Sequence, residues 1–277
     1  MSVNVRAVGA RDQRVQRLRR LLRRASVRDA EHAFVAEGVR LVEAALDARA
    51  RIEGLFVAPE WRLSVPTAAV VERAAGRGVA VYELGPGIME RVADTVSPQP
   101  VCAVVEAVDL GLDELLSRPG DSERDLILVC VDVRDPGNLG AVLRIAGATG
   151  VGGVVCCAGT VDPFNPKVVR ASAGAVFRVR LVVGTAPTEA LERLGSQGYR
   201  RWATVPRGGT DYAVADFEGR SALVLGNEGA GLPEEVVSRL DGSLTIPMDA
   251  GTESLNVAMT VAVLCFDAAR RRRLAAG

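Results

Sequence analysis

The fold of this chain is decided by the stretch Leu126–Arg144, whose sequence is LILVCVDVRDPGNLGAVLR. The apolar run Leu126–Asp132 predicts a buried strand, and Asp135-Pro136-Gly137 directly after it has the composition of a turn. Asn138 is a good N-cap for a helix that follows. Ligands of open α/β sheets bind at the carboxyl ends of strands, beside such turns, so this stretch also indicates where a site should lie.

Arg144 stands on this expected helix, which is otherwise apolar. An arginine that snorkels from a packed face fits the position, and so does an arginine that binds a ligand. The residues alone leave both interpretations open.

The strand–turn–helix pattern repeats over the rest of the C-terminal half. Alternation of buried strands with helices is typical of a parallel sheet covered on both faces, an α/β fold. The expected strands are Leu126–Asp132, Gly153–Cys156, Arg178–Val183, Arg201–Val205, Ala222–Leu225 and Ser243–Ile246, and the expected helices lie near 138–149, 165–172, 187–196, 233–239 and 254–271.

Residues 1–107 have the pattern of a second, smaller α/β unit. Its expected helices are 11–24, Val39–Ala48, Val65–Ala75 and Gly87–Ala93, and its expected strands are Ile52–Val57, Val79–Leu84 and Val101–Val105. Residues 108–125 contain glycine, proline and several acids, which predicts a linker. The second domain is therefore expected over 126–277.

A glycine-rich loop, Leu225-Gly226-Asn227-Glu228-Gly229-Ala230-Gly231-Leu232-Pro233, follows one of the expected strands. Its glycines let backbone amides approach a ligand, but neither common phosphate-binding glycine motif is present. Glu228 would also repel a phosphate. The loop therefore suits a sugar hydroxyl or a cationic ligand better than a phosphate.

The third segment comprises Ile246-Pro247-Met248 and the last helix, which Ser254 can cap. This helix is apolar nearly all round, which predicts burial, in part against a second subunit. Asn256 on such a helix must find hydrogen-bond partners or cost roughly 1–3 kcal/mol. A structural network and a catalytic role both account for it.

Composition indicates a soluble cytoplasmic protein of 277 residues, 48% of them hydrophobic. No apolar run approaches the roughly 20 residues of a membrane span, and the N-terminus lacks the apolar core of a signal peptide. Five cysteines in apolar contexts and one histidine offer no metal-ligand spacing, so no metal site is expected. The cysteines are expected to be reduced and packed in the core.

The formal net charge is zero, but the charges are unevenly distributed. Eight arginines between Arg11 and Arg28 face a single acid, Asp12, on a helix whose other face is apolar. Such a helix either binds nucleic-acid phosphates or is simply solvated. The run Arg270–Arg273 at the other end of the chain leaves the same two possibilities.

The order and spacing of the three segments are more specific than any one of them. NLGAVLRIA (138–146), LGNEGAGL (225–232) and ESLNVA (253–258) closely resemble the motifs of the SpoU/TrmH branch of the SPOUT methyltransferases, which are RNA ribose 2′-O-methyltransferases. NPKVVRASAG (165–174) adds a fourth likeness. The resemblance covers 126–271 specifically. It covers 1–107 more loosely, through Phe34–Leu41, and implies a ribosomal-protein-like α/β domain that binds the RNA substrate.

This resemblance implies a deep trefoil knot in the C-terminal domain, a homodimer with both active sites near the subunit contact, and S-adenosylmethionine as cofactor. The strand–helix pattern could not have predicted a knot, because knots are essentially absent elsewhere. The positions that match the family's cofactor site are Thr204, Leu225, Gly226, Asn227, Ile246, Met248, Leu255 and Ala258.

For the reaction, the resemblance makes Arg144 the catalytic arginine, with Asn138, Glu228, Ser254 and Asn256 orienting it and the ribose. An arginine with a pKa above about 12 is a poor general base. We therefore expect Arg144 to hold the phosphate and lower the pKa of the ribose hydroxyl, while phosphate or water accepts the proton. The expected RNA contacts are the arginines between 11 and 28, chiefly Arg19, Arg20, Arg23 and Arg24, together with Arg170 and Ser172.

Two other classes compete with this interpretation. A nucleotide-dependent oxidoreductase or phosphotransferase would carry a dinucleotide or phosphate loop, and neither is present. An RNA-binding module that has lost activity would be expected to lack some motif residues, and all are in place. Within the family, ribosomal RNA is favoured over transfer RNA by analogy with the N-terminal domain, and a role in antibiotic resistance stays open.

Overall fold

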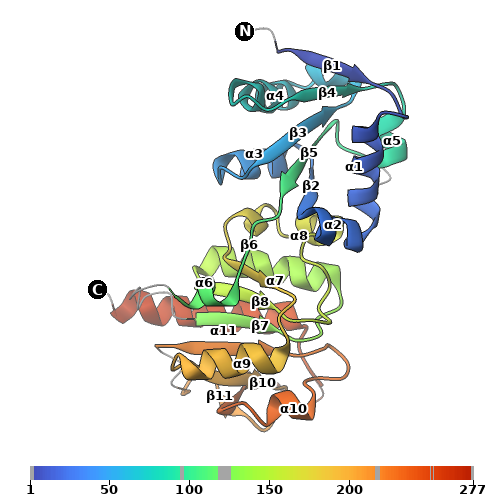
Figure 1. Cartoon of the computed structure of the whole chain (residues 1–277). Helices are drawn as coiled ribbons and strands as arrows, with labels where there is room; N and C mark the ends of the chain where they lie inside the picture. The colour runs from blue at the N-terminus through green and yellow to red at the C-terminus, as the bar shows by residue number, and fades with distance from the viewer. Residues whose placement is uncertain are drawn as a thin grey trace. The chain divides into compact units, whose positions relative to one another are not determined.

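A computed structural model describes residues 3–93, 97–117, 126–215, 219–249, 251 and 253–275. They form two compact units (Figure 1), of which unit 1 spans residues 1–108 together with 164–177, and unit 2 spans 109–163 together with 178–277. Within the linker expected over 108–125, residues 109–116 instead form a short strand and a short helix that belong to unit 2, and residues 118–125 lie outside the described residues. No helix among the described residues is both long and apolar enough to cross a membrane.

Unit 1 contains a mixed sheet with the strand order β1-β4-β3-β5-β2. Its first three strands run parallel, and β5 is antiparallel to both of its neighbours. The strands are β1 (Val5–Val8), β2 (Ala33–Glu37), β3 (Ile52–Val57), β4 (Val81–Leu84) and β5 (Val101–Glu106). The helices are α1 (Gln13–Arg23), α2 (Ala25–Glu31), α3 (Val39–Asp47), α4 (Val65–Gly76), α5 (Ile88–Val92) and α8 (Pro166–Ala171), with 3-10 turns η1 (Pro59–Leu63) and η3 (Ala175–Phe177).

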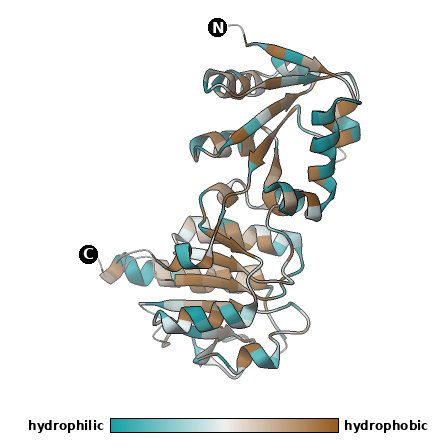
Figure 2. Cartoon of the chain, in the orientation of Figure 1, coloured by the Kyte–Doolittle hydropathy of each residue, from teal (hydrophilic) through white to brown (hydrophobic). Residues whose placement is uncertain are grey.

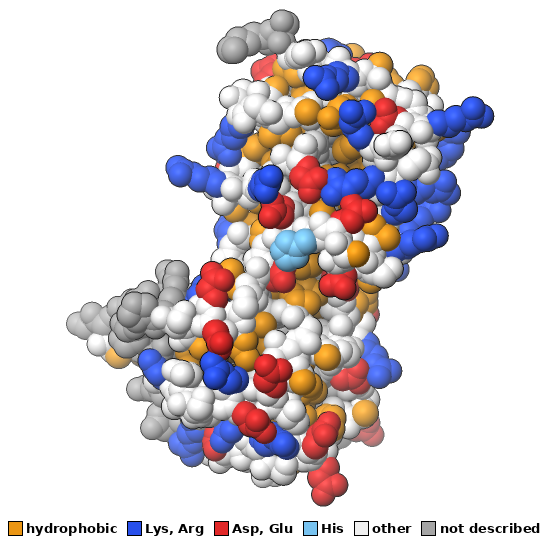
Figure 3. Space-filling model, viewed as in Figure 1, with side chains coloured by type: hydrophobic (Ala, Val, Ile, Leu, Met, Phe, Trp, Pro, Cys, Tyr) orange, Lys and Arg blue, Asp and Glu red, His pale blue; other side chains and the backbone are white. Residues whose placement is uncertain are grey.

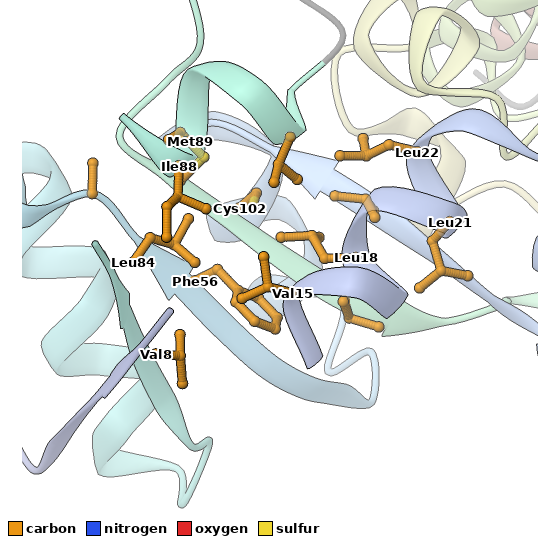
Figure 4. Packing of buried hydrophobic residues seen from close by; sticks show 14 of the residues in the cluster. Val8, Val15, Leu18, Leu21, Leu22, Phe56, Leu84, Ile88, Met89 and Cys102 are labelled. Atoms are coloured by element: carbon orange, nitrogen blue, oxygen red, sulfur yellow. The ribbon is translucent and has the colours of Figure 1, made fainter. Parts of the chain in front are cut away.

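The arginine-rich helix α1 forms as its pattern predicts. Asp12 caps it by accepting a hydrogen bond from the Arg14 amide at 2.8 Å. Val15, Leu18 and Leu21 are buried, and Figure 4 shows them packed with Phe56, Leu84 and Met89 against the sheet. One face of α1 therefore holds the core of unit 1, and the other faces carry the arginines.

A segment from the C-terminal half completes unit 1. Phe34 on β2 stacks on Phe164 at 4.8 Å and on Phe177 at 5.6 Å between ring centroids. The left-handed Gly174 lies so close to Ala44 that an added Cβ would be 2.6 Å from the alanine Cβ. Residues 164–177 thus share a core with residues far away in the sequence, a grouping that no local pattern indicated.

Unit 2 is built on a parallel sheet with the order β11-β13-β10-β12-β7-β8-β9-β6, all of whose described strand pairs are parallel as expected. The strands are β6 (Asp109–Leu110), β7 (Leu126–Cys130), β8 (Gly153–Cys156), β9 (Leu181–Val183), β10 (Arg200–Thr204), β11 (Thr210–Asp211), β12 (Ser221–Leu225) and β13 (Gly242–Thr245). The helices are α6 (Leu112–Leu116), α7 (Pro136–Thr149), α9 (Pro187–Ser196), α10 (Glu234–Val237) and α11 (Val257–Ala275). The central strands β12, β7 and β8 are buried along their whole length and mostly apolar, whereas most helices carry a hydrophilic face (Figure 2).

Two predicted helix starts are wrong. Asp135, not Asn138, caps α7: its carboxylate accepts from the Asn138 amide at 2.8 Å, and Pro136 takes the first helical position, where no amide donor is needed. The last helix begins at Val257 rather than at Ser254, and Asn256 accepts from the Ala258 amide at 2.8 Å. The side chain of Asn138 and the Nδ2 group of Asn256 therefore remain available for hydrogen bonds with other side chains.

Arginines near the C-terminus tie elements of unit 2 together. Arg272 donates to the carbonyls of Thr149 and Gly150, at 2.6 and 3.3 Å, where α7 ends. Arg271 pairs with Asp267 at 2.7 Å and donates to three carbonyls between residues 212 and 215. These two members of the 270–273 run are therefore structural.

The five cysteines are free and buried, as their apolar contexts predicted. Burial raises the pKa of the Cys157 and Cys265 thiols to about 12. Thiols with such a pKa stay protonated at neutral pH, which makes them unreactive as nucleophiles.

Replacing Phe34 tests the shared core of unit 1. Because Phe34 is fully buried between two aromatic rings, Phe34→Ala should lower the free energy of unfolding of this unit by about 3–5 kcal/mol. The measurement is hydrogen exchange of the β2 and β5 amides in the full-length protein as a function of urea. Leu63→Ala, at a side chain that is 87% exposed, is the control and should change stability by less than about 0.5 kcal/mol. Equal effects of the two variants would contradict the packing described.

Candidate functional site

A cavity of about 860 Å³ lies in unit 2 at the carboxyl ends of β10 and β12. Strand β13 and the first turns of α11 complete its wall. The sequence-predicted residues that line it are Thr204, Gly226, Asn227, Glu228, Ile246, Met248, Ser254, Leu255 and Asn256. Residues from two of the three motifs therefore meet at one cavity.

Asn227 shapes the glycine loop on one side of this cavity. Its side-chain oxygen accepts from the amides of Gly229 and Ala230, both at 3.0 Å. Its backbone exchanges two hydrogen bonds with Gly231, also at 3.0 Å. At Gly226 an added Cβ would lie 2.7 Å from the Gly231 carbonyl carbon, so only glycine fits there. The loop is thus a closed turn held by one asparagine.

Asp132 anchors that asparagine from the neighbouring strand end. The Asn227 side-chain amide donates to the Asp132 carbonyl at 3.0 Å and to its carboxylate at 3.3 Å. Asp132 was missed in the sequence as a site residue. An acid at the carboxyl end of a buried strand was the signal that could have revealed it.

Three asparagine and glutamate side chains join all three motifs in one network. Asn138 Nδ2 donates to Glu228 Oε1 at 2.8 Å, and Asn256 Nδ2 donates to Asn138 Oδ1 at 2.8 Å. Since Asn256 Oδ1 accepts from the Ala258 amide, the orientation of each amide is defined. The hydrogen bonds run in one direction, from Asn256 to Asn138 and from Asn138 to the Glu228 carboxylate. Asn256 therefore has the partners that its position required.

Two predicted cofactor residues do not line the cavity. Leu225 is fully buried in β12, and its carbonyl accepts from the Val131 amide at 2.8 Å. Ala258 is buried in the first turn of α11. Apolar lining residues that sequence reasoning missed are Val205, Pro206, Leu232, Val237, Leu240, Leu244, Val257 and Leu264. Several of them flank predicted strand ends, but apolar residues are so common there that they gave no distinct signal.

Arg144 lies apart from this network within the chain. It is exposed on α7 and does not line the cavity. Six residues separate it from Asn138, which corresponds to about 9 Å along the helix axis and about 240° around it. The cavity-lining residues that the structure describes include no arginine or lysine.

The arginines expected to bind RNA differ in their surroundings. Arg19, Arg20, Arg23 and Arg24 are exposed, and Figure 3 shows basic side chains gathered over the side of unit 1 where α1 lies. Within the same run Arg28 is wrong as an RNA contact, because it is buried and donates to the Leu21 carbonyl at 2.7 Å. Arg17 is occupied by ion pairs with Glu31 and Glu53.

The two expected RNA contacts on and after α8 are also engaged within unit 1. Arg170 lies 3.5 Å from the buried carboxylate of Glu37, with 30% of its side chain exposed. Ser172 is fully buried and its hydroxyl donates to the Val169 carbonyl at 2.7 Å. Ser172 thus packs the segment 164–177 in place, and in this arrangement it presents no group to RNA.

Comparison with known proteins matches both halves of the chain. The SpoU rRNA Methylase family model covers residues 125–266, and the MRM3-like substrate binding domain covers residues 12–103. The 23S rRNA (guanosine(2553)-2′-O)-methyltransferase RlmP of Bacillus subtilis is 31% identical over 235 residues, which is 85% of this chain and 88% of the relative.

Solved structures of similar architecture extend over nearly the whole chain. The AdoMet-bound rRNA methyltransferase from Sinorhizobium meliloti is 30% identical with a TM-score of 0.82, covering 96% of this chain and 98% of the other. The SpoU methyltransferase AviRb from Streptomyces viridochromogenes, in complex with AdoMet, is 26% identical with a TM-score of 0.83, covering 95% and 99%. The resemblance stated from the motifs is thereby confirmed: the chain belongs to the SpoU rRNA methylase family.

Proposed function

We propose that this protein transfers a methyl group from S-adenosylmethionine to a ribose 2′-hydroxyl of ribosomal RNA. The observation that carries the proposal is the network of Asn138, Glu228 and Asn256 at the cavity, because it brings all three family motifs to one place. RlmP, a 23S rRNA enzyme, matches most of the chain. This supports ribosomal RNA over the alternatives, a transfer RNA substrate or a resistance enzyme.

The cavity fits S-adenosylmethionine in size and in chemistry. Its volume of about 860 Å³ lies in the range of small-molecule sites. Ile246, Met248 and Leu255 offer apolar walls for an adenine ring, and the carboxylate of Glu228 suits a cationic ligand better than a phosphate. When bound, the cofactor supplies a methyl group activated by a positively charged sulfur.

The side chains of the network prepare the ribose for reaction. Asn138 donates to Glu228 and is itself oriented by Asn256, and Ser254 lines the same cavity. In our proposal these four residues orient the sugar. Arg144 binds the neighbouring phosphate and lowers the pKa of the 2′-hydroxyl, while phosphate or water accepts the proton.

Arg144 would meet the site across a homodimer interface. The exposed face of α11 carries Met259 and Phe266, which are 61% and 50% exposed and stand two turns apart on the same side of the helix. Helix α11 packs on α7, the helix that bears Arg144. A second copy covering this surface would bury the apolar side chains and bring an arginine to a cavity whose described lining residues include none. We also propose the family's trefoil knot, a cytoplasmic location, and an RNA-binding domain and a methyltransferase domain that correspond to unit 1 and unit 2.

The activity is tested by mapping ribose methylation. Ribosomal and transfer RNA from cells with and without the protein should differ at a 2′-O-methyl position in ribosomal RNA. Purified Arg144→Ala should transfer methyl groups roughly 10²–10³-fold more slowly, as is usual when a group that stabilises transition-state charge is lost. Arg193→Ala, at an exposed ion pair with Asp113, is the control with unchanged rate. Near-normal transfer by Arg144→Ala, with transfer abolished by Ser254→Ala, would refute the role of Arg144.

The dimer is tested by placing charge on the exposed face of α11. Met259→Asp combined with Phe266→Asp should convert the protein from dimer to monomer in light scattering, because two carboxylates cannot be buried there without partners. Methyl transfer should fall with it. Val65→Asp, at a side chain of unit 1 that is 80% exposed, should change neither property. A wild-type protein that is monomeric while fully active would exclude this arrangement.

RNA binding by α1 is tested through its dependence on salt. Replacing Arg19, Arg20, Arg23 and Arg24 with glutamine should reduce the slope of log binding constant against log salt by up to about 2.8, at about 0.7 per phosphate neutralised. The measurement is filter binding of ribosomal RNA between low and moderate salt. Arg73→Gln, whose arginine pairs with Asp47 at 2.6 Å, is the control. An unchanged slope in the fourfold variant would show that α1 is only a solvated face.

A further inference from the structure

Asp132 has an unusual backbone conformation at the edge of the cavity. It follows β7 directly and adopts the left-handed region with φ +55°, which side chains other than glycine, asparagine and aspartate seldom do. The two carboxylate oxygens of Asp132 have different partners. One accepts from Asn227 Nδ2 at 3.3 Å, and the other accepts from Arg134 Nε at 2.8 Å.

Arg134 is held by one nitrogen and is otherwise available. Its side chain is 74% exposed. Among the described residues, Asp132 is its sole hydrogen-bond partner, through Nε. Arg201, in contrast, gives Nε and a terminal nitrogen to Asp241 at 2.8 Å and its remaining nitrogen to the Leu191 carbonyl. All three nitrogens of the Arg201 guanidinium therefore donate to groups of the protein, whereas the two terminal nitrogens of Arg134 are exposed to solvent.

The position of this guanidinium relates it to the substrate side of the cavity. One carboxylate separates it from Asn227, which lines the cavity. Four residues further on, Asn138 takes part in the network with Glu228 and Asn256. The cavity-lining residues that the structure describes include no basic side chain, and Arg134 is an arginine that hydrogen bonds connect to the wall of the cavity through Asp132.

The geometry points to Arg134 as an RNA-binding residue. It contacts a phosphate next to the methylated ribose, and Asp132 holds its guanidinium in position. A planar guanidinium with two free parallel donors binds a phosphate bidentately. Because Asp132 already holds the Arg134 guanidinium through Nε, the side chain loses less conformational entropy when it binds the phosphate. This assignment rests on the proposed function, and it differs from the role of Arg144 because it needs no second subunit.

The test measures RNA affinity separately from catalysis, with an unmodified 23S rRNA transcript as the probe. Arg134→Ala should weaken filter binding about three- to tenfold at low salt and reduce the salt slope by about 0.7. The KM for RNA should rise while the affinity for S-adenosylhomocysteine stays unchanged. Arg134→Lys should keep the salt slope but recover only part of the affinity, because an ammonium group cannot bind bidentately.

Asp132→Asn distinguishes positioning from simple charge. Asparagine tolerates the left-handed backbone, and the substitution removes one negative charge near the RNA. Electrostatics alone therefore predicts tighter RNA binding, whereas loss of a positioning carboxylate predicts weaker binding, by roughly two- to fivefold. The matched pair is Arg193→Ala and Asp113→Asn, an exposed ion pair of the same unit that does not line the cavity.

Two results would overturn the assignment. If Arg134→Ala and Arg193→Ala change the affinity and the salt slope equally, Arg134 is an ordinary surface charge. If Asp132→Asn strengthens RNA binding, the carboxylate only repels RNA and positions nothing. Both readouts are binding measurements, so they remain decisive even if the wild-type protein fails to methylate the transcript, a failure that would count against the proposed function instead.

Discussion

The parallel pairing of β7 with β12 is the constraint on which the site depends. It aligns Leu126–Cys130 with Ser221–Leu225, and the Val131 amide extends it by donating to the Leu225 carbonyl. Both strands therefore end at the same edge of the sheet. Asp132 and the start of α7 follow one strand, and the loop Gly226–Gly231 follows the other. Without this register neither Asp132 and Asn227 nor Asn138 and Glu228 could meet.

The network at that edge explains why amide side chains occupy two of its positions. Asn138 accepts from Asn256 and donates to Glu228, which requires an acceptor and a donor in one side chain. An aspartate at 138 would place a second carboxylate against Glu228 and lose the donor. Hydrogen bonds that run in one direction toward a carboxylate also polarise one another, which strengthens each of them.

The arginines of this chain divide into structural groups and available groups. Arg28, Arg271 and Arg272 donate to backbone carbonyls. Their guanidinium groups thus provide hydrogen-bond partners for carbonyls at the ends of helices and in loops. Arg19, Arg24 and Arg144 stand exposed. Although the formal net charge is zero, exposed arginines are concentrated over α1. The attraction of an anionic polymer depends on this local distribution of charge and not on the net charge.

The amino-acid sequence by itself determined the α/β class, most strands and helices of unit 2, and the three motifs. Each of these follows from local periodicity, from the composition of turns or from the order of residues. Strands β1, β2, β6 and β11 and helix α2 were missed. Strand β1 is short with one buried residue, β2 is buried throughout and so lacks the alternation typical of a strand, β6 and β11 have two residues each, and α2 has no capping side chain. The caps of α7 and α11 were misplaced by three residues and by two, respectively, because Asp135, Asn138, Ser254 and Asn256 are all good capping residues.

Only the tertiary structure decided which of those residues meet. The insertion of 164–177 into the core of unit 1, the position of Arg144 away from the cavity and the division of the Asp132 carboxylate between Asn227 and Arg134 all depend on partners distant in the chain. A local pattern can predict that a side chain needs a partner. Which partner it finds is settled by how strands pair and helices pack, because that choice is made by shape and hydrogen bonding among segments far apart in the sequence.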